Sequence, residues 1–144
     1  MIPADLARAC AEKMWDDDAT SRGLGMALEQ VGPGRAVLTM EVTGRMVNGH
    51  AVCHGGMIFT LADSAMGFAS NTHNDVSLAQ HCTVTYLRPA RLGEILRAEA
   101  VERVREGRGG MYDVRVTGED GAVVAEFRGH VRTTGQKFFP EFST

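Results

Sequence analysis

Hydrophobic and polar residues alternate through most of the second half of the chain, and a period of two predicts β-strands. The segments SLAQHCTVTYLRP, EILRAEAVERV, GMYDVRVTG and AVVAEFRGHVRTT follow this pattern, and the first of them ends at Pro89. In the second segment, the expected inward positions are Leu96, Ala98, Ala100 and Val104. In the last segment, they are Val123, Ala125, Phe127 and Val131. The outward positions of that last segment are Glu126, Arg128, His130 and Arg132.

The first half of the chain begins with a different period. Residues 3 to 17 are predicted to form a short amphipathic helix, with Leu6, Ala7, Cys10 and Met14 on one face. The stretch GLGMALEQVGPGRAVLTMEVT is predicted to form a hairpin, because Gly-Pro-Gly at 32 to 34 is a turn signal between two alternating runs.

Residues 55 to about 71 carry the strongest helix signal, and MIFTLADSAMGFAS is apolar nearly all round, which is typical of a buried helix. The order is helix, two strands, long helix, four strands, and the later connections are short. These features predict one α+β domain over residues 1 to 144, with a core at about 23 to 134 and a mostly antiparallel sheet wrapped around the long helix. The uncovered sheet face and edges predict an oligomer.

Composition narrows the functional classes. The 144 residues carry a net charge of −3 with both signs mixed, which disfavours nucleic-acid binding. Three cysteines (Cys10, Cys53 and Cys82) show no disulfide framework, so a reducing, cytoplasmic location is expected. No N-terminal run resembles a signal peptide, and the apolar stretch from 55 to 70 is too short to span a membrane.

Asp63 is the anomaly of the long helix, because an unpaired carboxylate among apolar side chains is costly to bury. Such an Asp could face solvent or accept a structural hydrogen bond. It belongs, however, to a narrow polar stripe at i, i+3, i+4 and i+7, which consists of Thr60, Asp63, Ser64 and Gly67. A stripe of this kind is expected to line a cleft or an interface.

The segment NGHAVCHGG, residues 48 to 56, lies where the chain enters this helix. The first N–H groups of a helix lack internal partners, and the helix dipole is positive there. Two glycines allow a ligand to approach that backbone closely, so an oxyanion could be stabilised at this point. Alternatively, the glycines only make a tight turn.

Two further interpretations of this segment are weaker. His50, Cys53 and His54 could bind a metal, but structural zinc sites usually have two pairs of ligands and no second pair occurs. Cys53 and His54 are sequence neighbours, whose side chains tend to diverge, so a Cys–His nucleophile is disfavoured. We therefore expect no metal and no cofactor.

Taken together, NGHAVCHGGMIFTLADSAMGFASN, TVTYLRPARLGE and VAEFRGHVR resemble the hotdog-fold acyl-CoA thioesterases, in particular the PaaI-type branch of phenylacetic acid degradation. The resemblance covers about residues 23 to 134. It implies a hotdog fold, in which an antiparallel sheet wraps a long helix. It also implies dimers that usually pair into homotetramers, with an active site across the dimer interface.

By the same resemblance, Asp63 from one subunit would be the general base or the nucleophile. The partner would supply the Gly55 N–H as oxyanion donor, with Asn48 orienting water and thioester and His54 polarising the carbonyl. Some relatives carry a helping Ser or Thr on the following strand, but the nearest match here is Ala79. Gln80 or His81 could take that role, and Gly56, Thr60 and Ser64 are further candidate substrate contacts.

The implied function is hydrolysis of an aryl- or phenylacetyl-type acyl-CoA to free acid and CoA. Candidate contacts for the CoA phosphates are Arg88, Arg91 and Arg108. Candidate acyl contacts are Met57, Phe59, Leu61 and Phe68, although most of them would serve as ordinary core. The alternatives are a hotdog hydratase or dehydratase, whose signatures are not found, and a non-enzymatic acyl-CoA-binding protein. Such a sensor would usually carry a DNA-binding segment, and it would not need Asp63.

Overall fold

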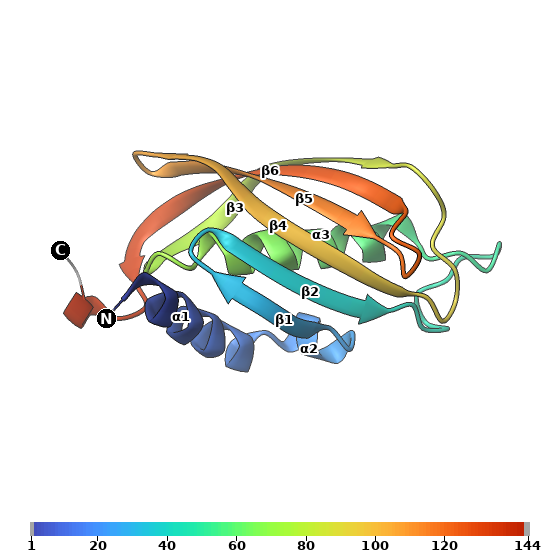
Figure 1. Cartoon of the computed structure of the whole chain (residues 1–144), viewed down its shortest axis with the longest axis horizontal. Helices are drawn as coiled ribbons and strands as arrows, with labels where there is room; N and C mark the ends of the chain where they lie inside the picture. Colours follow the sequence, from blue (N-terminus) through green and yellow to red (C-terminus); the bar gives the residue numbers. More distant parts are fainter. Residues whose placement is uncertain (1, 143–144) are drawn as a thin grey trace.

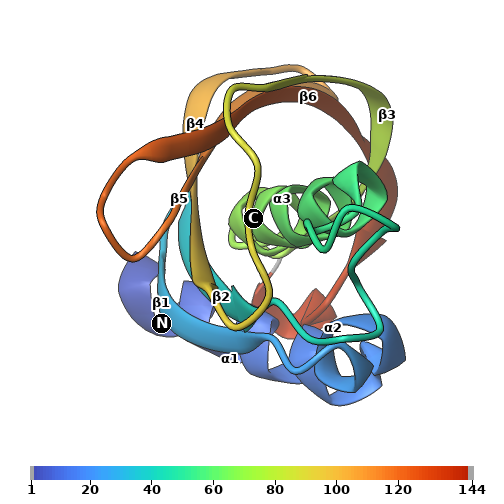
Figure 2. The ribbon, with the colours of Figure 1, turned by 90° about the vertical axis from the view of Figure 1, so that its right-hand side faces the viewer.

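In the computed structural model, which describes residues 2–142, an antiparallel sheet curves around one long helix (Figures 1 and 2). The helices are α1 (Pro3–Asp17), α2 (Ala19–Gly23), α3 (Gly55–Ser70) and a final 3-10 turn (Pro140–Phe142). The strands are β1 (Ala27–Gly32), β2 (Arg35–Glu41), β3 (Asp75–Tyr86), β4 (Ile95–Glu106), β5 (Gly109–Thr117) and β6 (Val123–Lys137). The six strands are ordered β1-β2-β4-β5-β6-β3, and every neighbouring pair is antiparallel. The predicted α+β class is confirmed, and so is the predicted order of elements, except that the structure adds α2 and the final 3-10 turn.

Helix α3 lies on the concave side of the sheet, and Figure 2 looks nearly along it. Its fully buried side chains are Leu61, Ala62, Ala65, Met66, Phe68 and Ala69. They pack against the inward residues of the strands in one core cluster, with Phe59 edge-on to Phe127 at a ring-centroid distance of 5.3 Å. Full burial of one Leu, Met or Phe side chain contributes about 1.5–3 kcal/mol, so this contact between helix and sheet dominates the hydrophobic stabilisation.

The N-terminal helices cover the side of α3 that the sheet leaves open (Figure 2). The Trp15 and Phe68 rings lie 5.8 Å apart, and the Ser21 and Ser64 hydroxyls are hydrogen-bonded at 2.9 Å. Met14 packs over Gly67, where an added Cβ would lie 3.6 Å from its terminal methyl. Ser64 and Gly67, two members of the predicted polar stripe, are therefore partly covered by α2 and α1 of the same chain.

Strand β4 departs from its predicted pattern at its far end. Leu96, Ala98 and Ala100 are buried as expected, but Val104 is 44% exposed. The pairing register with β5 shifts between Glu102 and Val104, so a bulge reverses the alternation of faces at this point. The inward position after Ala100 is taken by Glu102, which accepts a hydrogen bond of 2.7 Å from the buried Tyr112 hydroxyl.

Strand β3 forms one edge of the sheet, and along this edge it has no strand partner among residues 2–142. It is 12 residues long, and most of its residues from Leu78 to Tyr86 are exposed, with Leu78 at 64%. A long, exposed edge strand with apolar side chains is a template for pairing with another chain.

No helix in the described residues is long and apolar enough to cross a membrane.

Helix α3 packs closely on the sheet at Gly129 of β6, where an added Cβ would overlap the sulfur of buried Met66. We predict that Gly129→Ala lowers the free energy of unfolding by about 1–3 kcal/mol, because the packed core must shift to admit the methyl group. Denaturant unfolding monitored by circular dichroism measures this. Gly23→Ala is the matched control, since an added Cβ there has nothing within 4 Å and its effect should stay within about 0.5 kcal/mol. Equal losses in both variants would contradict the packing argument.

Candidate active site

The N-terminal end of α3 lies at the end of the molecule where the loops that precede α3 and follow β3 come together (Figure 1). Backbone hydrogen bonds hold these loops to the helix start. The N–H of Cys53 donates to the Ala90 carbonyl, and the N–H of His54 donates to the Met46 carbonyl, both at 2.7 Å. An isolated bridge also pairs Val52 with Arg91. The segment predicted to meet the ligand is therefore held from two sides.

Four N–H groups open α3, and three of them are used. Met57 and Ile58 donate to the His54 carbonyl at 2.9 and 3.4 Å, and Gly56 donates to Nδ1 of the His54 ring at 3.2 Å. The N–H of Gly55 has no acceptor within residues 2–142. It is an unpartnered donor at the positive end of the helix dipole, which suits a developing negative charge on oxygen. By contrast, the Gly56 N–H, predicted as a substrate contact, is taken by His54.

His54 is the N-cap of α3, and this contact determines where its ring can donate. Because Nδ1 accepts the Gly56 N–H, a neutral imidazole must carry its proton on Nε2. The side chain is exposed, so Nε2–H is free to donate to a ligand. A carbonyl oxygen is the type of acceptor that this donor and the Gly55 N–H could bind together.

Asn48 lies on the same loop and has a structural role on one side of its amide. Its Oδ1 accepts the N–H groups of His50 at 2.9 Å and Val52 at 3.4 Å, which stabilises a tight turn where Ala51 adopts a φ of 60°. The side chain is exposed, and Nδ2 has no acceptor in the described part of the chain. Asn48 can therefore hold the loop with its oxygen and donate to a water or a thioester with its nitrogen.

Asp63 is partly buried on α3, and no side chain or backbone group of residues 2–142 forms a hydrogen bond or ion pair with it. Burial raises the pKa of its carboxyl group above the ordinary value. The charge of Asp63 also contributes, after burial, to the raised pKa of the Cys82 thiol on β3. The carboxylate thus lies on the side of α3 toward the edge strand, and it is an unpaired, desolvated base of the kind found at functional sites.

Asp63 and the Gly55 N–H are well separated along α3. They are eight residues apart on a continuous helix, which is about 12 Å along its axis at 1.5 Å per residue. This separation is large for two groups that would act on one carbonyl from a single chain.

The other candidate residues near α3 are brought together only in part. The Thr60 hydroxyl donates to the Gly56 carbonyl at 2.8 Å within the helix, and the Ser64 hydroxyl is paired with Ser21. His81 pairs with His130, which faces outward between buried residues of β6, so His81 lies on the convex face away from Asp63. Gln80 is exposed at the bulge between Ala79 and His81.

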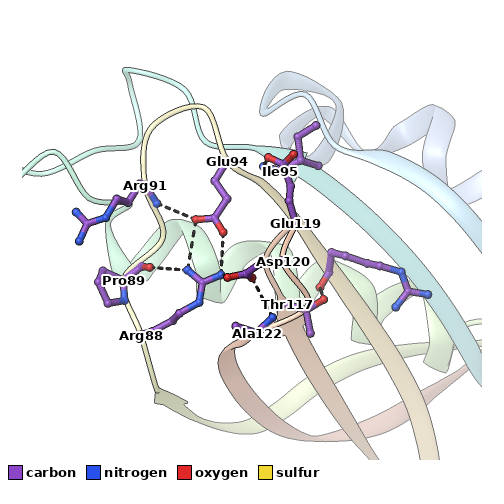
Figure 3. A network of polar contacts seen from close by, with 10 residues as sticks. Arg88, Pro89, Arg91, Glu94, Ile95, Thr117, Glu119, Asp120 and Ala122 are labelled. Atoms are coloured by element: carbon purple, nitrogen blue, oxygen red, sulfur yellow. Dashed lines mark hydrogen bonds and ion pairs between the residues drawn. The ribbon is translucent and has the colours of Figure 1, made fainter.

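The three candidate arginines have different surroundings. Arg88 donates to Glu94 at 2.8 Å and to Asp120 at 3.1 Å, and its Nε is buried without a partner (Figure 3). The hydrogen bond from Arg88 lowers the pKa of Glu94, which also accepts the backbone N–H of Arg91 at 3.1 Å. Because acidic groups use its guanidinium, Arg88 is poorly placed to bind a phosphate.

Arg91 and Arg108 both have exposed side chains. Arg91 adjoins the loop that carries Asn48, through its bridge to Val52. Arg108 lies in the turn between β4 and β5, where it donates to the Thr133 carbonyl at 2.9 Å. That turn is at the opposite end of the sheet from the start of α3 (Figure 1).

Two cavities adjoin the first turn of α3. One of about 350 Å³ is lined by Cys53, Gly55, Ile58, Tyr86, Leu87, Arg88 and Pro89. The other, of about 410 Å³, is lined by Gly23, Leu24, Gly25, Thr43, Arg45, Met46 and Met57. Met57 is therefore accessible to a ligand, whereas Leu61 and Phe68, also considered as acyl contacts, are fully buried core residues.

Tyr86 was not anticipated from the sequence as part of the site. Its hydroxyl donates to the Gly55 carbonyl at 2.7 Å across 31 positions of sequence. No spacing rule links residues so far apart, and only the path of β3 back past the start of α3 brings them together.

For a metal, no group of three His, Cys, Asp or Glu side chains in the described residues converges closely enough.

Comparison with known proteins identifies the family. The model of the Thioesterase superfamily matches residues 50–125, which include the end of the loop before α3, α3 itself and strands β3, β4 and β5. The chain belongs to the thioesterase superfamily. It is 38% identical over 125 residues to "Acyl-coenzyme A thioesterase PaaI" of Escherichia coli K12, covering 87% of this chain and 89% of that protein.

Solved structures support the same placement of this thioesterase. The E. coli PaaI protein from the phenylacetic acid degradation operon superposes with a TM-score of 0.93 at 36% identity, covering 94% of this chain and 99% of that one. A mutant of PaaI from Thermus thermophilus gives 0.77 at 37% identity, covering 80% and 98%. A Streptococcus mutans protein bound to acetyl-CoA gives 0.76 at 25% identity, covering 78% and 91%. The hotdog fold, the resemblance to PaaI-type thioesterases and the expectation of a thioester hydrolase are confirmed.

The raised pKa of Asp63 has a consequence for stability. A carboxyl whose pKa is higher in the folded than in the unfolded protein favours folding when protonated, so its stabilising effect is lost as the pH rises through the folded pKa. We predict that Asp63→Asn raises the melting temperature at pH 7, and that this advantage shrinks as the pH falls through the raised folded pKa and disappears below pH ~4, where the wild-type carboxyl becomes protonated in both states. Differential scanning fluorimetry across pH measures it. Asp16→Asn, at an exposed position, is the control, and its melting temperature relative to wild type should not depend on pH in this way.

Proposed function

We propose that this thioesterase hydrolyses acyl-CoA thioesters, and that Asp63 is its general base or nucleophile. The observation that carries the proposal is the pair of unsatisfied groups on α3. One is the Gly55 N–H at the positive end of the helix, and the other is the Asp63 carboxylate, whose pKa is raised by burial; neither has a partner among residues 2–142. Thioester hydrolysis needs a donor for the oxyanion and a base for the attacking water, and these two groups match those needs.

The reaction would proceed by addition and elimination at the carbonyl carbon. The thioester oxygen accepts the Gly55 N–H and the Nε2–H of His54, which polarise the carbonyl. Asp63 removes a proton from a water molecule held with the help of the Asn48 amide nitrogen, and the water oxygen bonds to the carbonyl carbon. The C–S bond then breaks, CoA leaves as the thiolate and takes up a proton, and the free acid is released. If Asp63 attacks directly, a mixed anhydride precedes the water step.

The site would be shared between two copies of the chain. The separation of about 12 Å between Gly55 and Asp63 along one helix supports this arrangement, as does the long, exposed edge strand β3. Pairing of two β3 strands would bring the α3 helices of two subunits near one another. Gln80, in the β3 bulge, is then the better candidate for the helping polar residue, since His81 faces the other side of the sheet. We propose a dimer as the minimal active unit and a homotetramer as the assembly.

The substrate is proposed to be an aryl- or phenylacetyl-type acyl-CoA. The name of the E. coli relative and the operon of its structure support this class, and the acetyl-CoA bound by the S. mutans relative supports CoA recognition. The cavity of about 410 Å³ beside Leu24, Met46 and Met57 is a candidate for the acyl group, because those side chains are apolar. Arg91 is the preferred contact for the CoA phosphates, being exposed beside the loop of the site.

A non-enzymatic acyl-CoA-binding protein and a hotdog hydratase are the alternatives. A binding protein has no need of a partly buried carboxylate without a partner in residues 2–142, which is costly to keep, and the signatures of a hotdog hydratase are not found in the sequence. Three free cysteines, two of them buried, are consistent with the proposed cytoplasmic location.

The function is tested with Asp63→Asn and a panel of acyl-CoA substrates, with released thiol as the readout. We predict that turnover falls by about 10²–10⁴-fold, the usual range for general-base catalysis, while the fold is retained. Asp16→Asn, on the exposed face of α1, serves as the matched control and should keep wild-type turnover. Near-normal turnover in folded Asp63→Asn would remove Asp63 from the mechanism.

The same variant tests whether the site is shared. Asp63→Asn and His54→Ala proteins, each impaired alone, would be unfolded and refolded as a mixture. Random pairing should restore about a quarter of the wild-type sites, because each mixed dimer contains one site with both native groups. Restored activity requires exchange of subunits, so no gain after verified mixing would show that the two residues act within one chain.

Arg91→Ala tests CoA recognition. We predict that KM for acyl-CoA rises by about tenfold with little change in kcat, because a charged contact formed equally in the ground state and the transition state is lost. Steady-state kinetics at low and high salt measure this, and the increase in KM should shrink at high salt. Arg108→Ala is the comparison, since Arg108 lies at the other end of the sheet in the same chain. Equal effects from both variants would contradict the preference for Arg91.

A further inference from the structure

Tyr86, at the end of β3, contacts the start of α3 in two ways. Its hydroxyl donates a hydrogen bond of 2.7 Å to the Gly55 carbonyl. Its ring lies against the same residue, since a Cβ added to Gly55 would be 3.0 Å from Tyr86 Cζ and 3.1 Å from the hydroxyl oxygen. The tyrosine therefore restrains both the position of Gly55 and the direction of its carbonyl group.

The carbonyl that Tyr86 holds belongs to the peptide group that links Gly55 to Gly56. The N–H of that same peptide group donates to Nδ1 of His54 at 3.2 Å. A single rigid peptide plane is thus bound at both ends, by the Tyr86 hydroxyl on its oxygen and by the His54 ring on its nitrogen. Donation to a carbonyl polarises the amide and strengthens the donation from its N–H, so the two hydrogen bonds support each other.

We propose that Tyr86 is a positioning residue that acts through the Gly55–Gly56 peptide group. It keeps the His54 ring oriented with its proton on Nε2, and it keeps Gly55 in the place where its own N–H is free for the oxyanion. The proposal rests on the thioesterase mechanism proposed above, in which the His54 Nε2–H and the Gly55 N–H bind the same carbonyl oxygen.

The surroundings of Tyr86 do not account for the contact as core packing. The side chain is 46% exposed and is not part of the hydrophobic core cluster. Tyr86 lines the cavity of about 350 Å³ beside Gly55, together with Ile58, Leu87 and Pro89. Burial, and then the nearby Cys53 thiol, raise the pKa of the Tyr86 phenol, so the hydroxyl remains a donor throughout the neutral range.

The chain offers a matched pair of variants because it contains two tyrosines, and each donates its hydroxyl at 2.7 Å. Tyr86→Phe removes only the hydroxyl that binds the Gly55 carbonyl. Tyr112→Phe removes a hydroxyl bound to Glu102 on β4, inside the sheet. Both substitutions keep the aromatic ring, so only the loss at Tyr86 should reach His54.

Two readouts separate a positioning role from a structural one. We expect Tyr86→Phe to lower kcat by roughly three- to tenfold, the effect of one hydrogen bond, with KM within about twofold of wild type. In protein carrying ¹⁵N-labelled histidine, at a pH where the imidazoles are neutral, His54 should show a protonated Nε2 and an unprotonated Nδ1. In Tyr86→Phe, the two ¹⁵N shifts should move toward each other as the second tautomer becomes populated. A His54→Gln variant assigns the signals.

Tyr112→Phe should lower the melting temperature and leave both kcat and the His54 signals unchanged. Gly55→Ala provides a second route, because the added methyl group pushes the Tyr86 ring away while the tyrosine is kept. It should shift the His54 signals in the same direction as Tyr86→Phe. Unchanged His54 tautomers in both variants would overturn the proposal. The NMR measurement uses no substrate, so it tests the role of Tyr86 even if the wild type fails to hydrolyse thioesters.

Discussion

The burial of α3 within the curved sheet is the contact on which the rest of the structure depends. The helix is apolar nearly all round, and it can be stable in water only if other elements cover most of its circumference. The sheet covers the side of α3 that carries the buried residues Leu61, Ala65 and Met66. Helices α1 and α2 cover another side, where Trp15 and Ser21 contact α3. The Met66 side chain occupies the space that a Cβ at Gly129 of β6 would need, so glycine at this position lets the helix pack closely on the sheet.

The backbone part of the proposed site lies at the start of α3. Along most of α3, backbone groups are hydrogen-bonded within the helix, and the first turn is the region where donors are left over. The fold restrains that turn from three directions, through Met46 before it, Ala90 after β3, and Tyr86 at the end of β3. One N–H, that of Gly55, remains without an acceptor in the described chain, and the rigidity of its surroundings suits a preorganised oxyanion donor.

The charged residues divide into two groups with different roles. On the convex face of the sheet, acidic and basic side chains neutralise one another, as in the pairs of Asp113 with Arg103 and Arg128. Arg88 is likewise paired with Glu94 and Asp120, so its charge stabilises the loop after β3. Asp63 is the exception, because it is partly buried and has no such partner within residues 2–142. It lies toward the exposed edge strand, since its charge contributes to the raised pKa of the Cys82 thiol on β3.

Local patterns in the sequence were sufficient to predict most of the elements and to single out two groups of the candidate site. The hairpin, the long helix and the four later strands follow from periodicity and turn residues, which act over a few positions. The HGG segment and Asp63 stood out because they break an apolar pattern, and the structure leaves both a free Gly55 N–H and an unpaired Asp63 carboxylate.

Tertiary structure alone decided which side chains are exposed and which polar groups are free to bind a ligand. The bulge in β4 turned Val104 outward, α2 covered Ser64, and acidic residues from two loops engaged Arg88. The contact of Tyr86 with Gly55 was equally hidden, since it joins residues 31 positions apart. Periodicity reports which face of an element is buried, but it carries no information about which distant side chain comes to lie against that face. Hydrogen bonds and ion pairs act only at contact distance, so the roles of these residues were settled only when the sheet closed around α3.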